Sequence, residues 1–534
     1  MWDHERRWAA ADWFALGGVL ALAAAMRLLF FTGFFGSDEV TYTEQALSTL
    51  QGNWPRSYYL GSIRYGVNVP VAAFLGLLGV NVAGAAAWAF VTSLAEVAAV
   101  YCAARYLAGP RVALLSALLL AILPLHVHLA GRLMADPPLA LFITLTFLLF
   151  KLGQDRDSST LFFAAGLAAG AVFWIKEASV IFLACFLFYP AVFRTWNPRW
   201  TWMILGAALV FAANSLMFWF LTGDPLQALT AARINKDKVV AAGGHASSAF
   251  YYPRYLLLDV RHTWLLGPLS LVGGILVVRS WLKRETSDEG MRYVLFWAAS
   301  LLVVFSLTVV AVDPLTLIMK QTNYITIFCA PLAILAGWLL SRLPRAWLTA
   351  TLTAVLLGSF VLAALEQQAV KVFTANSKAA VAFAQQHRDA TVYGTVNALM
   401  AGIFYDRLLA KQASKGARLV EPLADLVTPS PRNASGATAG GDRPRFAIVD
   451  LQTLDWGDNG LRTLRDVPSC WRRVGQLEPV QEGAGRWIGN ALLAAANAVS
   501  SPNGAVVRAL AGVTEIRPAW IFDVPGKCAA AGDR

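Results

Sequence analysis

The sequence is poor in charged residues, which make up only 14% of its 534 positions, whereas hydrophobic residues make up 57%. A typical soluble domain carries roughly a quarter of charged residues. Long apolar stretches also recur through residues 1–365. The shortage of charge therefore excludes an ordinary soluble enzyme and predicts a mainly helical protein that crosses a membrane many times.

Motifs of several common enzyme classes are absent. The region after residue 365 has no glycine-rich phosphate loop and no nucleophile elbow, which argues against a nucleotide-binding domain or an α/β-hydrolase there. Only five cysteines occur, and none has the spacing of metal ligands. Three of them lie in apolar segments. Cys470 and Cys528 lie near the C-terminus and would be able to form a disulfide if that region is outside the cytoplasm.

The net charge of +11 does not indicate nucleic-acid binding, because many Lys and Arg residues fall between apolar segments. This distribution is typical of membrane topology, in which cytoplasmic loops are rich in positive charge. Arg6 and Arg7 place the N-terminus inside. The acids Asp38, Asp136 and Asp313 then fall in loops on the other side.

The apolar stretches predict about eleven membrane-spanning helices. A hairpin of two short helices is expected within 161–193, with Lys176 and Glu177 at its outer tip, because both flanks are basic. Residues 71–80 are too few to span the membrane and are expected to lie on its outer surface. The remaining expected spans are 13–35, 82–106, 110–130, 137–152, 201–221, 264–281, 293–312, 325–341 and 346–365. Arg27 interrupts the first span and is expected to snorkel or to pair inside the bundle.

The character of the sequence changes after residue 365. We expect residues 1–365 to form a transmembrane catalytic domain and residues 366–534 a small soluble extracytoplasmic α/β domain. A Ser/Gly/Pro-rich loop is expected over 428–444. Helices are expected at 378–388 and 397–415, and strands at 390–395, 417–420, 446–450 and 470–477. An accessory or acceptor-recognition role is the simplest interpretation of this domain.

The loop after the first span holds the leading candidate site. Ser37 is a suitable N-cap for a short helix in which Asp38 and Glu39 occupy the first turn, and Gly52 and Asn53 would end it. Two acids there would complement the helix dipole in any protein. Ionisable residues against a membrane are functional candidates by default, however. Tyr42 shares a face with Asp38 at i, i+4 and is expected to bind substrate.

Other outer segments supply further candidates for phosphate or substrate binding. Arg64 suits either a phosphate or lipid-headgroup snorkelling. Asp136 precedes two prolines and suits either chemistry or a helix start. Lys176 suits either a substrate or an ion pair with Glu177. Among the cations of 222–263, Arg254 is the preferred candidate. His126 and His128 are not taken as a metal pair, because i, i+2 residues on a helix point apart.

Three classes of function would use acids and cations gathered at one membrane face. A transferase would hold a lipid tail in an apolar groove, its phosphate by Lys and Arg, and an acceptor by an acid. A transporter or flippase would place its charges near the bilayer midplane on broken helices, with repeat symmetry. A receptor or scaffold would not need acids on several short loops. The charges at helix ends favour the transferase.

An ordered series of motifs resembles one family. It consists of Asp38-Glu-x-x-Tyr42, Arg64-Tyr-Gly-Val-Asn-Val-Pro70, Tyr106-Leu-Ala-Gly-Pro-Arg111, Gly131-Arg-Leu-Met-Ala-Asp136-Pro-Pro and Ile175-Lys-Glu177. In this order it resembles the GT-C glycosyltransferases of the protein O-mannosyltransferase and lipid A aminoarabinose transferase type. The resemblance covers roughly the first 200 residues. The family usually has a basic residue or His followed by Pro-Pro where this chain has Arg64-Tyr65-Gly66, so the basic residue is kept and the prolines are lost.

The resemblance implies a polyprenyl-phosphate-linked sugar donor and an acceptor hydroxyl or phosphate on the outer face of a bacterial cytoplasmic membrane. Asp38 matches the catalytic acid of the first loop, with Glu39 beside it, and Asp136 matches the acid of the second loop. A divalent cation bridging Asp38, Asp136 and the phosphate is compatible with oxygen ligands. A glycan, a lipid and a protein all remain open as the acceptor.

Overall fold

The computed structural model describes residues 8–54, 57–241, 248–283, 289–313, 315–409, 418–427, 443–499, 501 and 504–525. The chain divides into two compact units. The first contains Met1–Phe31, Ser48–Gly79 and Ala83–Ala363. The second contains Thr32–Leu47, Val80–Val82 and Ala364–Arg534, so it combines the C-terminal region with the segment that carries Asp38.

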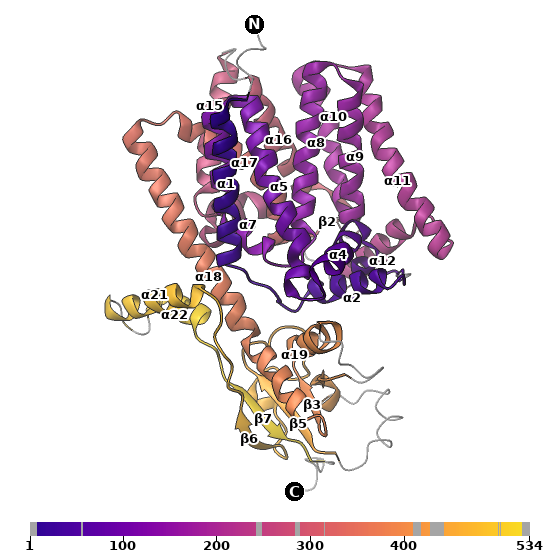
Figure 1. The fold of residues 1–534 in the computed structure, drawn as a ribbon, viewed down its shortest axis with the longest axis vertical. Helices are drawn as coiled ribbons and strands as arrows, with labels where there is room; N and C mark the ends of the chain where they lie inside the picture. The colour runs from indigo at the N-terminus through magenta and orange to yellow at the C-terminus, as the bar shows by residue number, and fades with distance from the viewer. Residues whose placement is uncertain are drawn as a thin grey trace. The chain divides into compact units, whose positions relative to one another are not determined.

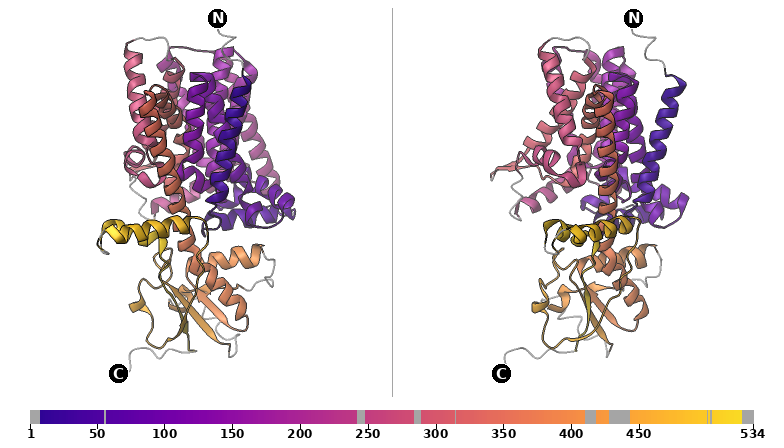
Figure 2. Two further views of the ribbon diagram at one scale, coloured as in Figure 1. Left: turned by 60° about the vertical axis from the view of Figure 1, so that its left-hand side comes forward. Right: turned by 90° about the vertical axis from the view of Figure 1, so that its left-hand side faces the viewer.

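The first unit is a helical bundle whose long helices run side by side (Figures 1 and 2). Its helices before residue 200 are α1 (Ala10–Leu29), α3 (Leu60–Ile63), α4 (Tyr65–Leu78), α5 (Val82–Ala108), α6 (Pro110–Ile122), α7 (Pro124–Ala130), α8 (Asp136–Arg156), α9 (Ser159–Ile175), η1 (Glu177–Ala184), α10 (Cys185–Phe193) and η2 (Pro198–Trp200). Its later helices are α11 (Thr201–Thr222), α12 (Gln227–Ala241), α13 (Tyr251–Leu258), α14 (Val260–Thr263), α15 (Leu266–Leu282), α16 (Glu289–Leu307), η4 (Thr322–Ile325) and α17 (Thr326–Ser341). Helices α2 (Asp38–Leu50) and α18 (Arg345–Gln386) pass from one unit into the other.

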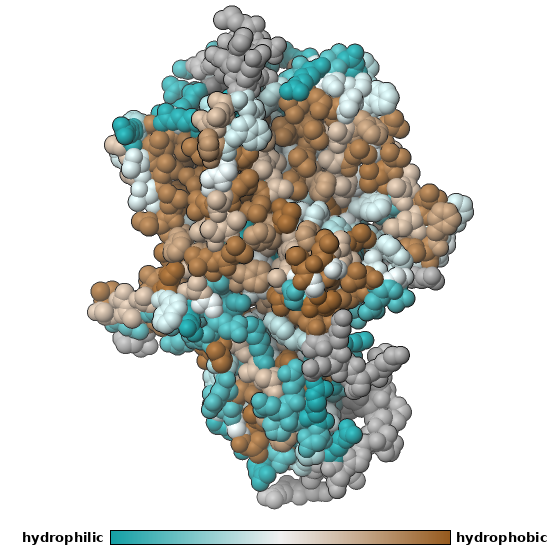
Figure 3. Space-filling model, in the orientation of Figure 1, coloured by the Kyte–Doolittle hydropathy of each residue, from teal (hydrophilic) through white to brown (hydrophobic). Residues whose placement is uncertain are grey.

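Among the described residues, seven helices are long and apolar enough to cross a membrane, or eight if the bent pair α6 and α7 counts as one span. The other three expected spans are present as the shorter apolar helices 159–175, 177–193 and 266–282. Length and composition thus support fewer spans than the eleven predicted. Apolar side chains cover much of the outer surface of this unit (Figure 3), as expected for a bundle that faces lipid.

The expected hairpin within 161–193 is confirmed. Its two ends meet, because the amide of Asn197 donates to Asp157 at 2.9 Å and the indole of Trp200 donates to Gln154 at 2.9 Å. The turn falls at Lys176, whose extended backbone separates α9 from η1. Glycines make the neighbouring packing close: a Cβ on Gly166 would collide with the backbone of Met203 in α11, an example of small residues at a membrane-helix interface.

One expected span ends early. Residues 293–312 were predicted as a single crossing, but α16 stops at Leu307 and Val309–Val312 form strand β1. Strand β1 pairs antiparallel with β2 (Leu315–Leu317). The β-branched residues Val309, Val310 and Val312 favour a strand over another helical turn.

The second unit contains a mixed five-stranded sheet with the order β4-β3-β5-β7-β6. Strand β3 is parallel to both β4 and β5, whereas β7 is antiparallel to β5 and β6. The strands are β3 (Thr391–Gly394), β4 (Glu421–Pro422), β5 (Arg445–Asp450), β6 (Arg472–Gln476) and β7 (Ala519–Asp523). The helices of this region are α19 (Val396–Gly402), the π-helix η5 (Ile403–Leu409), α20 (Ala424–Val427), η6 (Leu464–Asp466), α21 (Gly485–Val499) and α22 (Ala505–Thr514).

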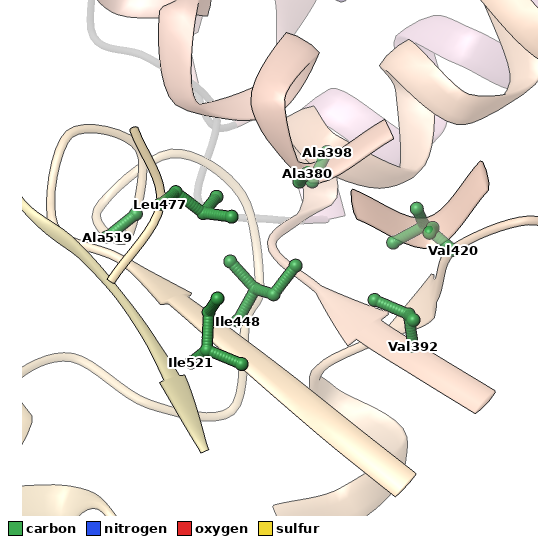
Figure 4. Close-up of a cluster of buried hydrophobic side chains, with 9 residues drawn as sticks. Ala380, Val392, Ala398, Val420, Ile448, Leu477, Ala519 and Ile521 are labelled. Atoms are coloured by element: carbon green, nitrogen blue, oxygen red, sulfur yellow. The ribbon is translucent and has the colours of Figure 1, made fainter. Parts of the chain in front are cut away.

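Hydrophobic side chains cover both faces of this sheet. On one face, Ala380 from the end of α18 and Ala398 from α19 lie over Val392, Ile448 and Ile521 (Figure 4). On the other face, Trp471 packs with strand residues such as Val449 and Phe522. A sheet covered on both sides is the reason why β5 is apolar at consecutive positions.

Most of the expected elements of this domain are present. Strands at 390–395, 446–450 and 470–477 and a helix at 378–388 are confirmed by β3, β5, β6 and the end of α18. The strand expected at 417–420 is wrong, because its place in the sheet is taken by Glu421–Pro422. Residues 428–442 of the expected loop lie outside the described part of the chain. Cys470 is disulfide-bonded, and its expected partner Cys528 also lies outside the described residues.

Candidate functional site

Four charged side chains from separate helix ends meet in the first unit. They are Arg64, Asp136, Lys176 and Glu177, which we call the ionic cluster. Each lies where a helix starts or breaks, so the ends of α3, α4, α8, α9 and η1 come together there. Arg64, Asp136 and Lys176 were predicted as site residues from three distant parts of the sequence, and the structure brings them together.

Asp136 is the first residue of α8 and is held by two donors. Its Oδ1 accepts a hydrogen bond from Lys176 Nζ at 3.0 Å, and its Oδ2 accepts one from Asn323 Nδ2 at 3.0 Å. The N-cap of α8 is Ala135, so Asp136 is not itself the cap. Pro137 and Pro138 follow in the first turn, where a missing backbone N–H costs nothing.

Arg64 forms a two-pronged ion pair with Glu177. Its Nε and Nη2 donate to the two carboxylate oxygens at 3.1 and 3.2 Å. Gly66 makes this approach possible, because a Cβ there would lie 2.8–2.9 Å from atoms of Ile175 and Trp174. The glycine that replaces the family's proline therefore lets the start of α4 pack against the end of α9.

Asp136, Lys176 and Glu177 of the ionic cluster are buried and Arg64 is nearly so; the cluster contains two cations and two acids, so its formal charges cancel. Lys176 also lies over the ring of Tyr324, with Nζ 3.9 Å from the ring centroid. The expected pair between Lys176 and Glu177 is not the one formed: Lys176 pairs with Asp136, and Glu177 pairs with Arg64. An anionic ligand would have to compete with these acids for the two cations.

An apolar groove of about 380 Å³ lies between α13, α15, α16 and α17. Helix α13 links it to the ionic cluster, since Tyr251 contacts Thr322, the neighbour of Asn323, and Tyr252 packs on Phe328 at 4.9 Å. The groove wall begins at the next residue, Pro253. Its lining is otherwise dominated by Leu256, Leu257, Leu271, Ile275, Leu295 and Leu332. Arg254, a predicted site residue, is exposed on α13 beside this lining, and within the described residues it forms no ion pair or hydrogen bond with the ionic cluster.

Asp38 begins α2 and belongs to the second unit. Its side chain is half-buried and forms no ion pair or side-chain hydrogen bond within the part of the chain that the structure describes. Glu39 is buried, and its carboxylate accepts a hydrogen bond from the backbone N–H of Ser37 at 3.0 Å. Tyr42 is buried as well.

The segment before Asp38 is anchored to the C-terminal part of the second unit. Asn397 Nδ2 donates to the carbonyl of Phe35 at 2.8 Å, and the Phe35 ring stacks on Phe373 at 4.8 Å. Gly36 has a φ of 101° and a Cβ there would collide with the Asn397 side chain. The expected short helix is confirmed, and it ends through Gly52, whose φ is 79°.

The residues present do not fit a metal ion at Asp136. Both of its oxygens already accept hydrogen bonds, and the ammonium of Lys176 supplies the compensating charge. Among the described residues, no three His, Cys, Asp or Glu side chains are grouped so that they could hold a metal. A cation shared by Asp38 and Asp136 would have to displace Lys176 or Asn323.

A second buried ionic network lies among α1, α5 and α7. Arg27 donates to Ser93, to the carbonyls of Ala23 and Ala121, and to His126 Nδ1 at 2.6 Å. His126 Nε2 lies 2.7 Å from Glu96. An arginine only donates hydrogen bonds, so Nδ1 of His126 accepts from Arg27 and carries no proton. The proton of the neutral ring is then on Nε2, which donates a hydrogen bond to Glu96. Arg27 therefore pairs inside the bundle, one of the two expected outcomes.

Removal of Arg27 should destabilise the bundle strongly, since it leaves Glu96 buried without its cation. We expect Arg27→Leu to lower the free energy of unfolding by about 3–5 kcal/mol, and Arg27→Leu with Glu96→Gln to lower it by less. Thermal unfolding in detergent measures both. The exposed arginine Arg233 provides the control, since Arg233→Leu should stay within about 0.5 kcal/mol. Equal losses for the single and double variants would contradict the network.

Three residues in or beside the ionic cluster were not predicted as site residues. Asn323 and Tyr324 precede the apolar helix α17, and Glu177 was considered only as a partner of Lys176. Polar residues at the start of a span were the available signal for Asn323. Nothing in the spacing along the chain indicates that it meets Asp136, 187 residues away.

Comparisons with known proteins agree with this fold. Residues 68–219 match the family model described as dolichyl-phosphate-mannose-protein mannosyltransferase. No curated protein sequence matches the chain. The crystal structure of ArnT from Cupriavidus metallidurans in the apo state is similar, with a TM-score of 0.56 and 16% identity over 88% of this chain and 97% of that one.

Two other solved structures carry ligands in the same fold. One is the same ArnT bound to undecaprenyl phosphate, with a TM-score of 0.54 and 16% identity over 83% of this chain and 94% of that one. The other is the archaeal oligosaccharyltransferase AglB from Archaeoglobus fulgidus in complex with an inhibitory peptide and a dolichol-phosphate. It gives a TM-score of 0.52 and 13% identity over 83% of this chain and 70% of that one. The family match over residues 68–219 and the shared fold together show that this chain is similar to membrane glycosyltransferases of the GT-C class.

Proposed function

We propose that this chain moves a sugar from a polyprenyl-phosphate-linked donor to an acceptor hydroxyl or phosphate at the outer face of a bacterial cytoplasmic membrane. The observation that carries the proposal is the ionic cluster beside an apolar groove. A lipid phosphate is the ligand class that needs both: cations for its head and an extended apolar surface for its tail. The undecaprenyl phosphate and dolichol-phosphate held by the similar structures support this choice.

The donor would place its isoprenoid chain in the groove of α13, α15, α16 and α17 and its phosphate against Arg64 and Lys176. The phosphate then competes with Glu177 and Asp136 for these cations. This exchange leaves an acid without its cation, and the acid must then turn toward water or another donor, because an unpaired buried carboxylate is costly. The exchange keeps both cations desolvated and preorganised for the charge that grows on the leaving phosphate.

In the transfer step, the acceptor oxygen forms a bond to the anomeric carbon of the sugar, and the bond from that carbon to the phosphate oxygen breaks. The polyprenyl phosphate leaves with the bonding electron pair. A hydroxyl acceptor loses its proton to Asp38, which acts as the general base. Glu39, bound to the backbone of Ser37, holds the start of α2, and Tyr42 and Arg254 are assigned to substrate contacts away from the reacting atoms.

The topology that suits this reaction has the N-terminus in the cytoplasm and the second unit outside. Residues 1–365 would form the catalytic transmembrane domain and residues 366–534 an extracytoplasmic domain that recognises the acceptor. The positive charges near the opposite helix ends support this orientation. There Arg105 pairs with Asp12 at 3.1 Å, and Tyr106 donates to Asp155 at 2.7 Å.

The alternative is a transporter or flippase for a lipid-linked or anionic substrate. Its best support is the buried network of Arg27, Glu96 and His126. That network is closed by direct hydrogen bonds from α1, α5 and α7, whereas a transport site must release its ligand to both sides. We therefore assign it to stability.

The transferase is tested with purified protein in detergent and a polyprenyl-phosphate donor that carries a labelled sugar. Membrane lipid, glycan and protein fractions serve as acceptors, and the product is identified by mass. We expect labelled product and free polyprenyl phosphate without any ion gradient. The same transfer is expected after chelation of divalent cations, because Lys176 supplies the charge at Asp136.

Two outcomes would contradict this function. Gradient-dependent movement of a solute across vesicles with an unchanged donor lipid would identify a transporter. Loss of transfer on chelation, with recovery on addition of a divalent cation, would keep the transferase but overturn the role given to Lys176.

A further inference from the structure

Helices α21 and α22 form a hairpin (Figures 1 and 2). Large apolar side chains on one side of this hairpin are exposed among the described residues. Exposed fractions there are 69% for Trp487, 84% for Val499 and 61% for Val506. One side of α21 is polar instead, because Arg486, Asn490 and Asn497 fall together at helical spacing. The hairpin therefore has separate polar and apolar sides that both face outward.

The hairpin contacts a short stretch of helix α18, residues 364–368. The backbone N–H of Gly485 donates to Gln367 Oε1 at 2.8 Å, and a Cβ on Gly485 would collide with the carbonyl of Ala364. Gly489 lies against Gln368 and against Thr514 of α22. These glycines let the hairpin press directly on residues 364–368.

The apolar part of α18 ends within this stretch. Residues 346–365 contain no charged residue, and Glu366, Gln367 and Gln368 follow at once. At 1.5 Å per residue the apolar part is roughly 30 Å long, the thickness of a bilayer's hydrocarbon core. If α18 crosses the membrane through 346–365, residues 364–368 lie at the boundary between hydrocarbon and headgroups, and the hairpin lies there too.

We propose that the α21–α22 hairpin lies in the headgroup region of the membrane that α18 crosses, with its apolar side in the lipid. Tryptophan is favoured at this depth, and Arg486 lies over the Trp487 ring at 4.7 Å. Residues 485–517 carry Arg486, Arg508 and Arg517 but only one acid, Glu515. This excess of positive charge suits anionic lipid headgroups.

The hairpin would fix the depth of the Asp38 segment, a consequence that rests on the proposed function. Phe35 stacks on Phe373 of the same helix, eight residues beyond the apolar part. This corresponds to roughly 12 Å along the helix axis. Asp38 would then lie among or just above the headgroups, where the phosphate of a lipid-linked donor is found.

The test uses spin labels on the full-length protein in vesicles of zwitterionic and anionic phospholipids. The half-buried Cys102 is replaced by Ala, and single cysteines are introduced as Trp487→Cys, Val499→Cys and Val506→Cys. Asn490→Cys and Asn497→Cys are the matched controls on the polar side. We expect the first three labels to collide mainly with dissolved oxygen, which concentrates in lipid, and the two controls mainly with a water-soluble nickel chelate.

Two results would overturn the proposal. Equal access of the nickel chelate to all five labels would show that the hairpin is in water. Protection of the apolar-side labels from both reagents would show that a protein, such as a second copy of this chain, covers them. A second variant checks the cause: Val499→Asp with Val506→Asp should move a label at position 487 from oxygen access to nickel access. None of these measurements depends on sugar transfer, so failure of the proposed function would be seen separately.

Discussion

Asp38→Asn is expected to cut sugar transfer by roughly 10²-fold or more, the usual scale for the loss of an acid–base group. The substitution keeps the size of the side chain but removes its charge and basicity. Donor binding and folding should stay nearly unchanged, since Asp38 makes no ion pair or side-chain hydrogen bond within the described residues. Single-turnover transfer and donor affinity, measured on the purified variant, separate these effects.

The alternative explanation for Asp38, a purely structural role at the start of α2, would account for only a small effect. The backbone N–H of Ser37, just before α2, donates its hydrogen bond to Glu39 and not to Asp38. Asp38 is therefore not needed as a cap. What remains is its interaction with the helix dipole, typically 0.3–1 kcal/mol. Loss of that interaction would change transfer by less than about tenfold.

Glu44→Gln is the matched control, because it removes the same charge from the same helix without touching its first turn. It should leave transfer within about twofold, a change of less than 0.5 kcal/mol. Near-normal transfer by a well-folded Asp38→Asn protein, or an equal loss in both variants, would remove Asp38 from the reaction.

The hairpin of the bundle was predictable because charge placement along a membrane protein is a local signal. The basic residues that flank 161–193 favoured a hairpin over one long helix, and the structure has a hairpin that turns at Lys176. The same logic brought Arg64, Asp136 and Lys176 to one set of helix ends. What it could not supply was their pairing, since Asp136 and Lys176 are 40 residues apart and both could have had nearer partners.

Other features were missed for physical reasons that the residues make plain. Strand β7 lies between β5 and β6 in the sheet. It was missed because Ala519–Asp523 is short and its sequence does not alternate between apolar and polar residues. The alanine-rich helix α21 lacks an acidic first turn and a strong cap. Residues 32–47 group with the C-terminal region through contacts of Phe35 and Gly36 with Asn397, which lies about 360 residues further along the chain. Such contacts leave no trace in local periodicity.

Arg64→Ala is expected to lower kcat/KM for the donor by roughly 10- to 100-fold, since a hydrogen bond to a charged group is worth about 1.5–3 kcal/mol. KM should rise, because the phosphate is charged in both the ground state and the transition state. Arg64→Lys should recover part of the loss, since it restores a charge but not the planar fork. Donor titrations at saturating acceptor provide both constants.

Glu177→Gln gives the opposite expectation and therefore the sharper test. Glu177 occupies both donors of Arg64 that point at it, so it competes with the phosphate. The amide keeps its shape but loses the charge, and KM for the donor should fall. If Arg64 only held α4 to η1, both Arg64→Ala and Glu177→Gln would lower thermal stability without opposite effects on KM.

The pair of Arg105 and Asp12 is the matched control for this comparison. It is also a buried two-pronged arginine–carboxylate pair, with distances of 3.1 and 3.3 Å, but it lies at the helix ends assigned to the cytoplasmic side. Arg105→Ala and Asp12→Asn should both lower stability and leave KM for the donor unchanged. Opposite shifts in KM at Arg64 and Glu177, with none at Arg105 and Asp12, would assign the phosphate to the ionic cluster. The same shifts at both pairs would reduce Arg64 to a structural residue.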